Sequence, residues 1–147
     1  MSLSGVFDIA GMGMSAQSIR LNTTASNLAN AQAAGKSEDE TYRARHPVFS
    51  SVAKDLLNPG SGPIASLSDQ ASVGLQVVDI VESTDPLQQR YEPNHPNAND
   101  DGYVFYPNVN VVEEMADMIS ASRSFQVNVE VMNSAKTMMQ RLLTLGQ

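Results

Sequence analysis

Apolar residues recur at intervals of seven near both ends of the chain. In the first 35 residues the row consists of Phe7, Met14, Leu21 and Leu28. From residue 108 onward the row consists of Val111, Met118, Phe125, Met132 and Met139. Apolar positions with this spacing are typical of helices that share a coiled-coil seam. The pattern therefore predicts a helix at each end of the chain, paired with the other or with helices of neighbouring molecules. We expect the second helix to begin at Asn110, because Asn followed three residues later by Glu resembles a capping box.

The predicted N-terminal helix carries almost no charge. Among the first 35 residues Asp8 and Arg20 are the charged side chains, and serine, threonine and asparagine are abundant. A helix that faces water normally shows Lys, Glu and Arg on its polar side. One interpretation is a weak helix whose start is loosened by Gly5, Gly11 and Gly13. We favour the alternative, in which small side chains let this helix pack against partners on several sides.

The middle of the chain, residues 36–107, is acidic and rich in turns. It contains all seven prolines, and it holds 11 acidic side chains against 5 basic ones. Strand-like runs occur at 41–49, 73–80 and 103–106, and the run of Pro and Gly at 58–63 predicts a loop. We expect two to four short strands here.

These observations predict an α+β fold. The long N- and C-terminal helices pair as an antiparallel, coiled-coil-like hairpin, so that residues 1–35 and 108–147 form one discontinuous domain. Residues 36–107 then form a small β-rich, irregular insert between the helices.

Composition excludes several functional classes. The chain has 147 residues, a formal net charge of −7 and no cysteine. An acidic protein without basic patches is not expected to bind nucleic acid or anionic lipid. No apolar run is long enough to cross a bilayer, so we expect no membrane insertion. The N-terminus lacks the basic region of a secretory signal, so we expect no cleaved signal peptide.

The sequence offers little for catalysis or metal binding. His46 and His95 each precede a proline, and their separation does not suit a metal site. The run from Asn97 to Gly102 resembles the first half of a calcium loop, but Asn108 occupies the position where a bidentate Glu is required. An Asx turn is the better interpretation of this run. We therefore predict no enzyme activity, no cofactor and no metal.

Several longer runs are shared with a known family. The run 21–30, LNTTASNLAN, resembles the signature of flagellar rod and hook proteins. Residues 91–112, with YEPNHP, GYV and PNVN, resemble proximal rod proteins of the FlgC type, as do SASRSFQ at 120–126 and the final LTLGQ. The sequence departs from many rod and hook proteins after Asn30, where AQAAG leads into a charged stretch. The short middle also argues against hook proteins, which carry large inserted domains.

The resemblance implies a structural subunit of the bacterial flagellar basal-body rod. Members of this family leave the cell through the flagellar type III export apparatus without processing. They polymerise with copies of themselves and other rod proteins into the drive shaft that crosses the periplasm toward the hook. In the family the two terminal helices pair as an inner coiled coil, which the seven-residue rows above would line. The family-motif residues expected to make polar contacts between subunits are Asn22, Asn27, Asn30, Pro107 and Asn108.

A protein of another class remains an alternative at this point. A soluble coiled-coil adaptor or a chaperone-like protein without a polymer role would also show two long helices. Such a protein offers no reason for an N-terminal helix that is poor in charge.

Overall fold

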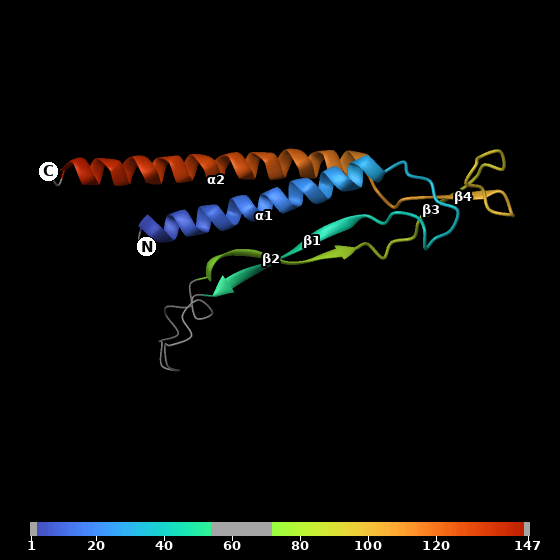
Figure 1. Ribbon diagram of the computed structural model, residues 1–147, viewed down its shortest axis with the longest axis horizontal. Helices are drawn as coiled ribbons and strands as arrows, with labels where there is room; N and C mark the ends of the chain where they lie inside the picture. Colours follow the sequence, from blue (N-terminus) through green and yellow to red (C-terminus); the bar gives the residue numbers. More distant parts are fainter. Residues whose placement is uncertain (1–2, 54–71, 146–147) are drawn as a thin grey trace, which may run out of the picture. The chain divides into compact units, whose positions relative to one another are not determined.

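Two long helices bracket four strands in the computed structural model, which describes residues 3–53 and 72–145. Helix α1 spans Leu3–Asn30 and helix α2 spans Val111–Leu145 (Figure 1). Between them lie β1 (Arg45–Ala53), β2 (Ser72–Glu82), β3 (Gln88–Tyr91) and β4 (Tyr103–Tyr106). The fold class is therefore α+β, and the prediction of a helix at each end is confirmed. None of the helices in the described ranges is long and apolar enough to cross a membrane.

The ends of the helices follow from local chemistry. Asn110 is the N-cap of α2, as predicted: its Oδ1 accepts from the backbone N–H of Val112 at 3.2 Å. Glu113 and Glu114 lie in the first turn, where the helix dipole favours negative charge. Helix α1 ends at Asn30 rather than near residue 35, because Gly35 pairs with Phe105 through two backbone hydrogen bonds of 2.9 and 3.1 Å.

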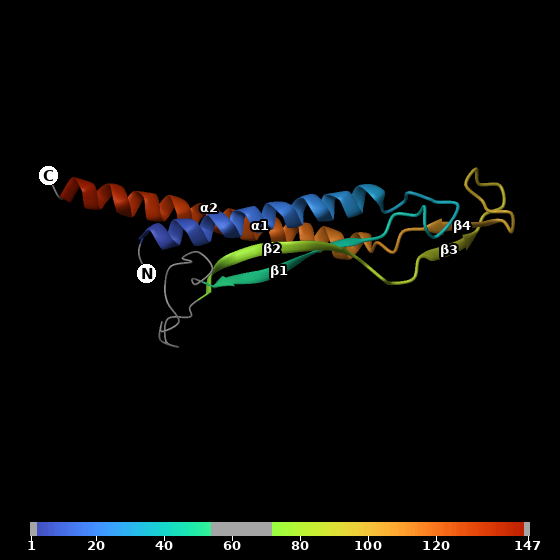
Figure 2. The same cartoon turned by 60° about the horizontal axis from the view of Figure 1, so that its bottom comes forward.

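The strands form two separate two-stranded sheets, β1–β2 and β3–β4. In the first sheet the two arrows run in opposite directions (Figures 1 and 2). In the second, β3 and β4 are antiparallel, with Gln88 opposite Tyr106 and Tyr91 opposite Tyr103. Four described strands agree with the prediction of two to four, although β1 and β2, at 9 and 11 residues, are longer than expected. The predicted loop at 58–63 lies outside the described residues.

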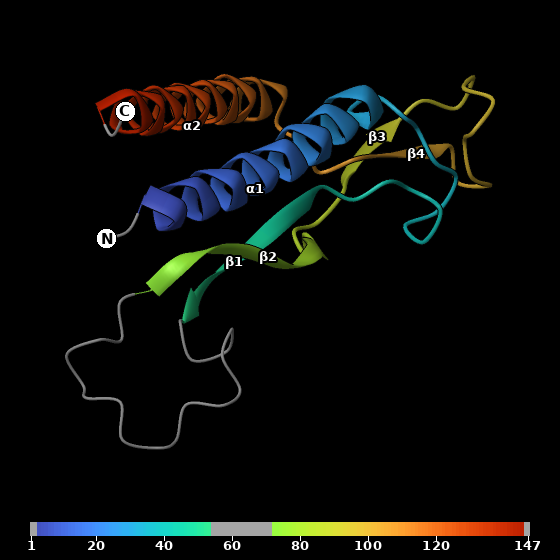
Figure 3. The ribbon, with the colours of Figure 1, turned by 60° about the vertical axis from the view of Figure 1, so that its left-hand side comes forward.

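The chain divides into two compact units. Unit 1 consists of Met1–Ile19, Val48–Asp79 and Ser122–Gln147. In it α1 lies between α2 and the β1–β2 sheet (Figure 3). Its buried apolar side chains are small: Ala10, Ala16 and Ala135. A Cβ on Gly13 would stand 2.8 Å from Nδ2 of Asn128, so this glycine permits a close approach of α1 to α2 within the unit.

Unit 2 consists of Arg20–Pro47 and Ile80–Ala121. Its buried apolar residues are Ala44, Val104, Pro107, Val109 and Ala121. Polar side chains are buried with them, among them Thr23, Thr24, Asn27 and Glu114. The interior of this unit is therefore held by hydrogen bonds as much as by apolar contact.

Candidate assembly site

Asn27, near the end of α1, is the centre of a polar cluster in unit 2. Its side chain is fully buried. Nδ2 donates to the carbonyl oxygen of Arg45 and to Oε1 of Glu114, both at 2.8 Å. Oδ1 accepts from the backbone N–H of Arg45 at 2.9 Å and from the hydroxyl of Tyr42 at 2.8 Å. A primary amide has two donor hydrogens and two acceptor lone pairs, so all of its hydrogen-bonding capacity is used.

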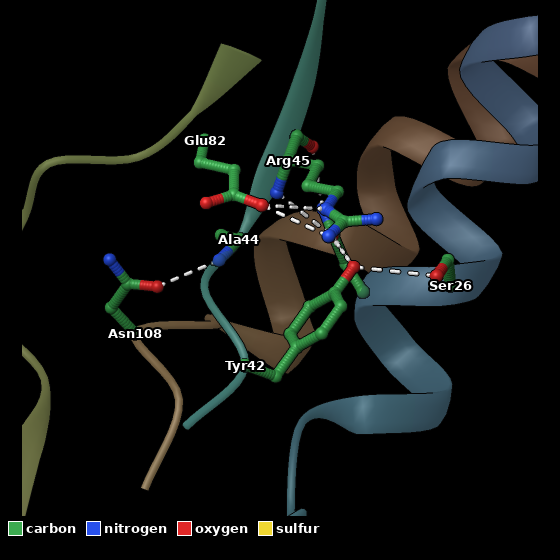
Figure 4. Close-up of polar contacts among 7 residues, drawn as sticks. Ser26, Tyr42, Ala44, Arg45, Glu82 and Asn108 are labelled. Atoms are coloured by element: carbon green, nitrogen blue, oxygen red, sulfur yellow. Dashed lines mark hydrogen bonds and ion pairs between the residues drawn. The ribbon is translucent and has the colours of Figure 1, made fainter. Parts of the chain in front are cut away.

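Further polar contacts extend this cluster to the end of β2 and the segment before α2 (Figure 4). Asn108 accepts from the backbone N–H of Ala44 at 2.8 Å and donates to the carbonyl oxygen of Asp85 at 2.9 Å. Arg45 and Glu82 form an ion pair at 2.9 Å. These contacts fix the first residues of β1 against the segments that flank it in unit 2.

Glu114, in the first turn of α2, is a buried carboxyl group. The residue is 5% exposed. Burial raises the pKa of this carboxyl above its usual value, and the negative charges of Asp117 and Glu113 raise the pKa further. The hydrogen bond from Asn27 and the positive charge of His46 act in the opposite direction. Three residues further along, Asp117 pairs with Arg20 of α1 at 2.6 Å.

The predicted seam residues lie beside the most buried helix positions. Phe7, Met14, Leu21, Leu28, Met118, Phe125 and Met132 are half-buried, and Val111 and Met139 are each 39% exposed. The helix positions below one-tenth exposure carry smaller or polar side chains: Ala10, Ala16, Thr23, Thr24, Asn27, Glu114, Ala121 and Ala135. The apolar rows therefore retain accessible surface, and their role as a seam stays a prediction.

The residues predicted to make polar contacts between subunits differ in exposure. Asn22 is exposed, whereas Pro107 is buried. Asn30 donates to the carbonyl oxygen of Ser26 in its own helix at 2.8 Å. Since Asn27 and Asn108 are also bonded within the chain, Asn22 is the best placed of the five for a contact with another subunit.

The sequence reasoning missed the partners of Asn27. Tyr42, Arg45 and Glu114 carried no signal of spacing or composition that would link them to Asn27. Their role depends on contacts between segments 18 and 87 residues apart. Periodicity, which is a local property, does not report such contacts.

Large apolar side chains are exposed on α2 in both units. In unit 2 they include Val112, Met115 and Ile119 at 76%, 51% and 55% exposure. These three residues are separated by three and four positions, so they lie on one face of the helix. In unit 1 the exposed set includes Val127, Met138, Leu142 and Leu143. Exposed apolar side chains gathered on a helix in this way are typical of a contact with another protein.

The described residues contain no arrangement suited to a metal ion. Across 3–53 and 72–145 no three His, Cys, Asp or Glu side chains are grouped as ligands. The run from Asn97 to Gly102, which resembles half a calcium loop, contains the Asx turn that the sequence predicted. Asn99 Oδ1 accepts from the backbone N–H of Asp101 at 3.0 Å. The same oxygen accepts from the N–H of Tyr103 at 2.8 Å, which closes the β3–β4 connection.

Comparison with known proteins identifies the family. A model described as flagella basal body rod protein matches residues 7–35, and one described as flagellar basal body rod FlgEFG protein C-terminal matches residues 100–145. The flagellar basal-body rod protein FlgC of Salmonella typhimurium is 46% identical over 147 residues, which covers 100% of both chains. The chain belongs to the FlgC family of flagellar basal-body rod proteins.

Further FlgC proteins support the same assignment. FlgC of Escherichia coli O6:H1 is 47% identical over the full length of both chains. FlgC of Borreliella burgdorferi is 35% identical over 154 residues, covering 100% of this chain and 99% of that protein. This rod protein is thus a structural subunit of the flagellar basal body that assembles with other rod proteins, and it is not an enzyme. Membership in the family decides against the adaptor alternative.

Proposed function

We propose that this rod subunit polymerises through its two terminal helices into the drive shaft that transmits torque toward the hook. The observation that carries the proposal is the exposed apolar surface of α2, above all Val112, Met115 and Ile119. Removing one such side chain from water contributes about 1.5–3 kcal/mol, so a few neighbours would supply a substantial driving force. Contacts that do not close on themselves produce a helical polymer.

Within one subunit, the proposed arrangement is an antiparallel coiled-coil hairpin of α1 and α2. In unit 2, Asn27 of α1 bonds to Glu114 at the start of α2, and Arg20, earlier in α1, pairs with Asp117, later in α2. Contacts in this order are those expected of antiparallel helices. In unit 1, Gly13 lies close to Asn128. These contacts support the proposal that residues 1–35 and 108–147 form one discontinuous domain, with residues 36–107 as an acidic insert.

The two apolar rows have a double role in this proposal. They flank the small, closely packed positions of each helix and remain half-exposed, so the same side chains can contact the partner helix and an adjacent subunit. The rows are Phe7, Met14, Leu21 and Leu28 on α1, and Val111, Met118, Phe125, Met132 and Met139 on α2. Asn22, which is exposed on α1, would add a hydrogen bond between subunits.

Location and export complete the proposal. The family places the subunit in the basal body, and we propose that the assembled rod crosses the periplasm. The subunit would reach it through the flagellar type III export apparatus, without a cleaved signal peptide.

Charge placed in an apolar row tests the proposal. We expect Leu21→Asp or Phe125→Asp to abolish rod assembly and swimming, because a carboxylate would be buried without a partner when subunits associate. Asn133→Asp, at an exposed position of α2, is the matched control and should swim normally. Swimming zones in soft agar and the recovery of basal bodies measure the effect. Normal swimming of the two apolar variants would refute the role of the helices.

A further inference from the structure

The two ends of α2 carry opposite charge. Residues 111–121, in unit 2, contain Glu113, Glu114 and Asp117 and no basic side chain. Residues 136–145, in unit 1, contain Lys136 and Arg141 and no acidic side chain. This direction of charge suits the helix dipole, so charge alone does not indicate a contact. The dipole does not explain the apolar side chains that are exposed beside these charges.

At the start of α2 an apolar row lies beside an acidic side chain. The row consists of Val112, Met115 and Ile119, which are separated by three and four positions and are more than half exposed. Glu113 is exposed next to Val112, and it forms no ion pair with any residue that the structure describes. This surface is therefore apolar with a negative edge.

The last turns of α2 show a second row of the same spacing, beside basic side chains. Residues 136–144 are all exposed. Lys136, Met139 and Leu143 are separated by three and four positions, so they lie on one face of the helix. Neither Lys136 nor Arg141 forms an ion pair within the described part of the chain. This surface is therefore apolar with a positive edge.

The exposure of the second row follows from the lengths of the helices. In unit 1 a Cβ on Gly13 would meet the side chain of Asn128, so these residues lie at the same level. In the proposed antiparallel hairpin, Leu3, ten positions before Gly13, then lies level with residue 138. Met139 and Leu143 follow the buried Ala135 at intervals of four. They therefore continue the face of α2 that packs against α1, past the first described residue of that helix.

We propose that the last turns of α2, residues 136–143, pack on the start of α2 in a second copy of the chain. With the two helices parallel and Met139 opposite Met115, a stagger of 24 residues, the rows align along their whole length. Lys136 then lies beside Glu113 of the second copy. The inference rests on the proposed polymer and specifies one of its contacts.

Charge decides against the other pairings of these two surfaces. Two acidic helix starts, or two basic helix ends, would place like charges together in an interface, which is unfavourable. Joining an end to a start brings opposite charges together and covers both apolar rows. The two surfaces differ, so the contact is heterologous and continues from copy to copy in an open chain.

Cysteine cross-linking tests which segments meet. The chain has no cysteine of its own, so only introduced thiols of this subunit react. Ala116 and Gln140 are exposed, flank the two rows and have the proposed stagger. They are about 36 Å apart along their own helix, so a disulfide between them must join two copies.

We would introduce Ala116→Cys with Gln140→Cys into the full-length chain, as the cell's only copy, and oxidise purified basal bodies. Disulfide-linked dimers and larger products are expected. Each single variant should give none. The control pair Ala116→Cys with Gln126→Cys should also give none, because Gln126 is exposed on α2 but lies outside the last turns.

The outcomes separate the contact from the polymer. If basal bodies of swimming cells give no dimers, or if both cysteine pairs give equal yields, the contact is overturned and the rod function still stands. A cross-linked product that contains another rod protein would overturn the choice of a second copy as occupant. Basal bodies assembled without this chain would overturn the proposed function itself.

A charge exchange in the chain with the first cysteine pair tests the chemistry of the contact. We expect Glu113→Lys and Lys136→Glu each to lower the dimer yield by about three- to tenfold, because each places like charges together. Combining them should restore the yield to within about twofold of the parent, which also excludes misfolding as the cause of the single effects. Glu130→Lys reverses a charge at an exposed position of α2 outside the contact, and it should leave the yield unchanged. A combined variant no better than either single one would overturn the proposed pairing.

Discussion

The side-chain amide of Asn27 substitutes for a neighbouring strand at Arg45. A strand partner would accept from the N–H of Arg45 and donate to its carbonyl oxygen, and Asn27 does both, at 2.9 and 2.8 Å. It does so at the first residue of β1, from a position on α1. The carboxyl of Glu114 and the hydroxyl of Tyr42 take up its remaining capacity. A helix, a strand and a second helix in unit 2 thus depend on one buried side chain.

Replacing Asn27 tests this dependence. We expect Asn27→Ala to lower the free energy of unfolding by about 2–4 kcal/mol, because buried groups of Arg45 and Glu114 lose their partner. Asn22→Ala removes the same amide from an exposed position of the same helix, and should change stability by no more than about 0.5 kcal/mol. Urea unfolding of the two purified variants measures both values. Equal effects would show that the cluster does not stabilise the chain.

Glu114 predicts a dependence of stability on pH. Its pKa is raised in the folded chain from the usual 4.5, so the folded chain binds this proton more tightly than the unfolded chain. The contribution of Glu114 is therefore most favourable below pH 4.5 and declines as pH rises through the raised pKa. Glu114→Gln keeps an acceptor for Asn27 and removes the titration. Relative to the parent, we expect the variant to gain stability between pH 4 and pH 7 in urea unfolding. A constant difference between the two chains would contradict this assignment.

Only part of this residue-scale picture could be predicted from the sequence. Asn27 was singled out because it belongs to a family run, and Asn110 because its spacing to Glu113 is that of a cap. Both signals are local. The burial of Glu114 was not predictable, since a glutamate in a first turn ordinarily faces water and its partner here lies 87 residues away.

At the scale of elements, both helices were predictable and their most buried rows were not. Spacing by seven reports where large apolar side chains recur, and it correctly indicated helices at both ends. The deepest positions instead include Ala10, Ala16, Ala121 and Ala135, whose small side chains contribute little to an apolar pattern. Strand β3, with the sequence QQRY and all four side chains exposed, has no alternation to recognise. Its pairing with β4 determines the strand.

The β3–β4 hairpin depends on one glycine conformation. Gly102 has φ of 79°, and a Cβ there would stand 2.9 Å from Cε2 of Tyr91. We expect Gly102→Ala to destabilise the chain by about 1–2 kcal/mol, through the left-handed backbone and this contact. Gly11→Ala is the opposite case. It lies within α1 with nothing near its would-be Cβ, and alanine should stabilise the helix by up to about 1 kcal/mol. Thermal unfolding measures the stability of the two variants. A loss of stability in both would contradict the idea that the backbone conformation at each glycine decides the effect.

At the scale of the whole molecule, charge is distributed unevenly along the sequence. The stretch 36–107 has 11 acidic and 5 basic side chains, while the first 35 residues have one of each sign. Helices that must associate closely gain from low charge, because charges removed from water need partners. The acidic middle carries most of the net charge of −7, and a net charge far from zero generally favours solubility. This division was visible in the sequence, because it depends on composition alone.

The anchoring of β1 at its beginning has a practical consequence for labelling the flagellum. Asn27 holds Arg45, Asn108 holds Ala44, and the N–H of Ser83 donates to the carbonyl oxygen of Ala44 at 2.7 Å. The join between the strands and the helix ends is thus made at residues 44–45 and 83. Ser51, exposed and later in β1, makes none of these bonds. In a chain without cysteine, Ser51→Cys therefore offers a single place to attach a fluorophore while the join is kept.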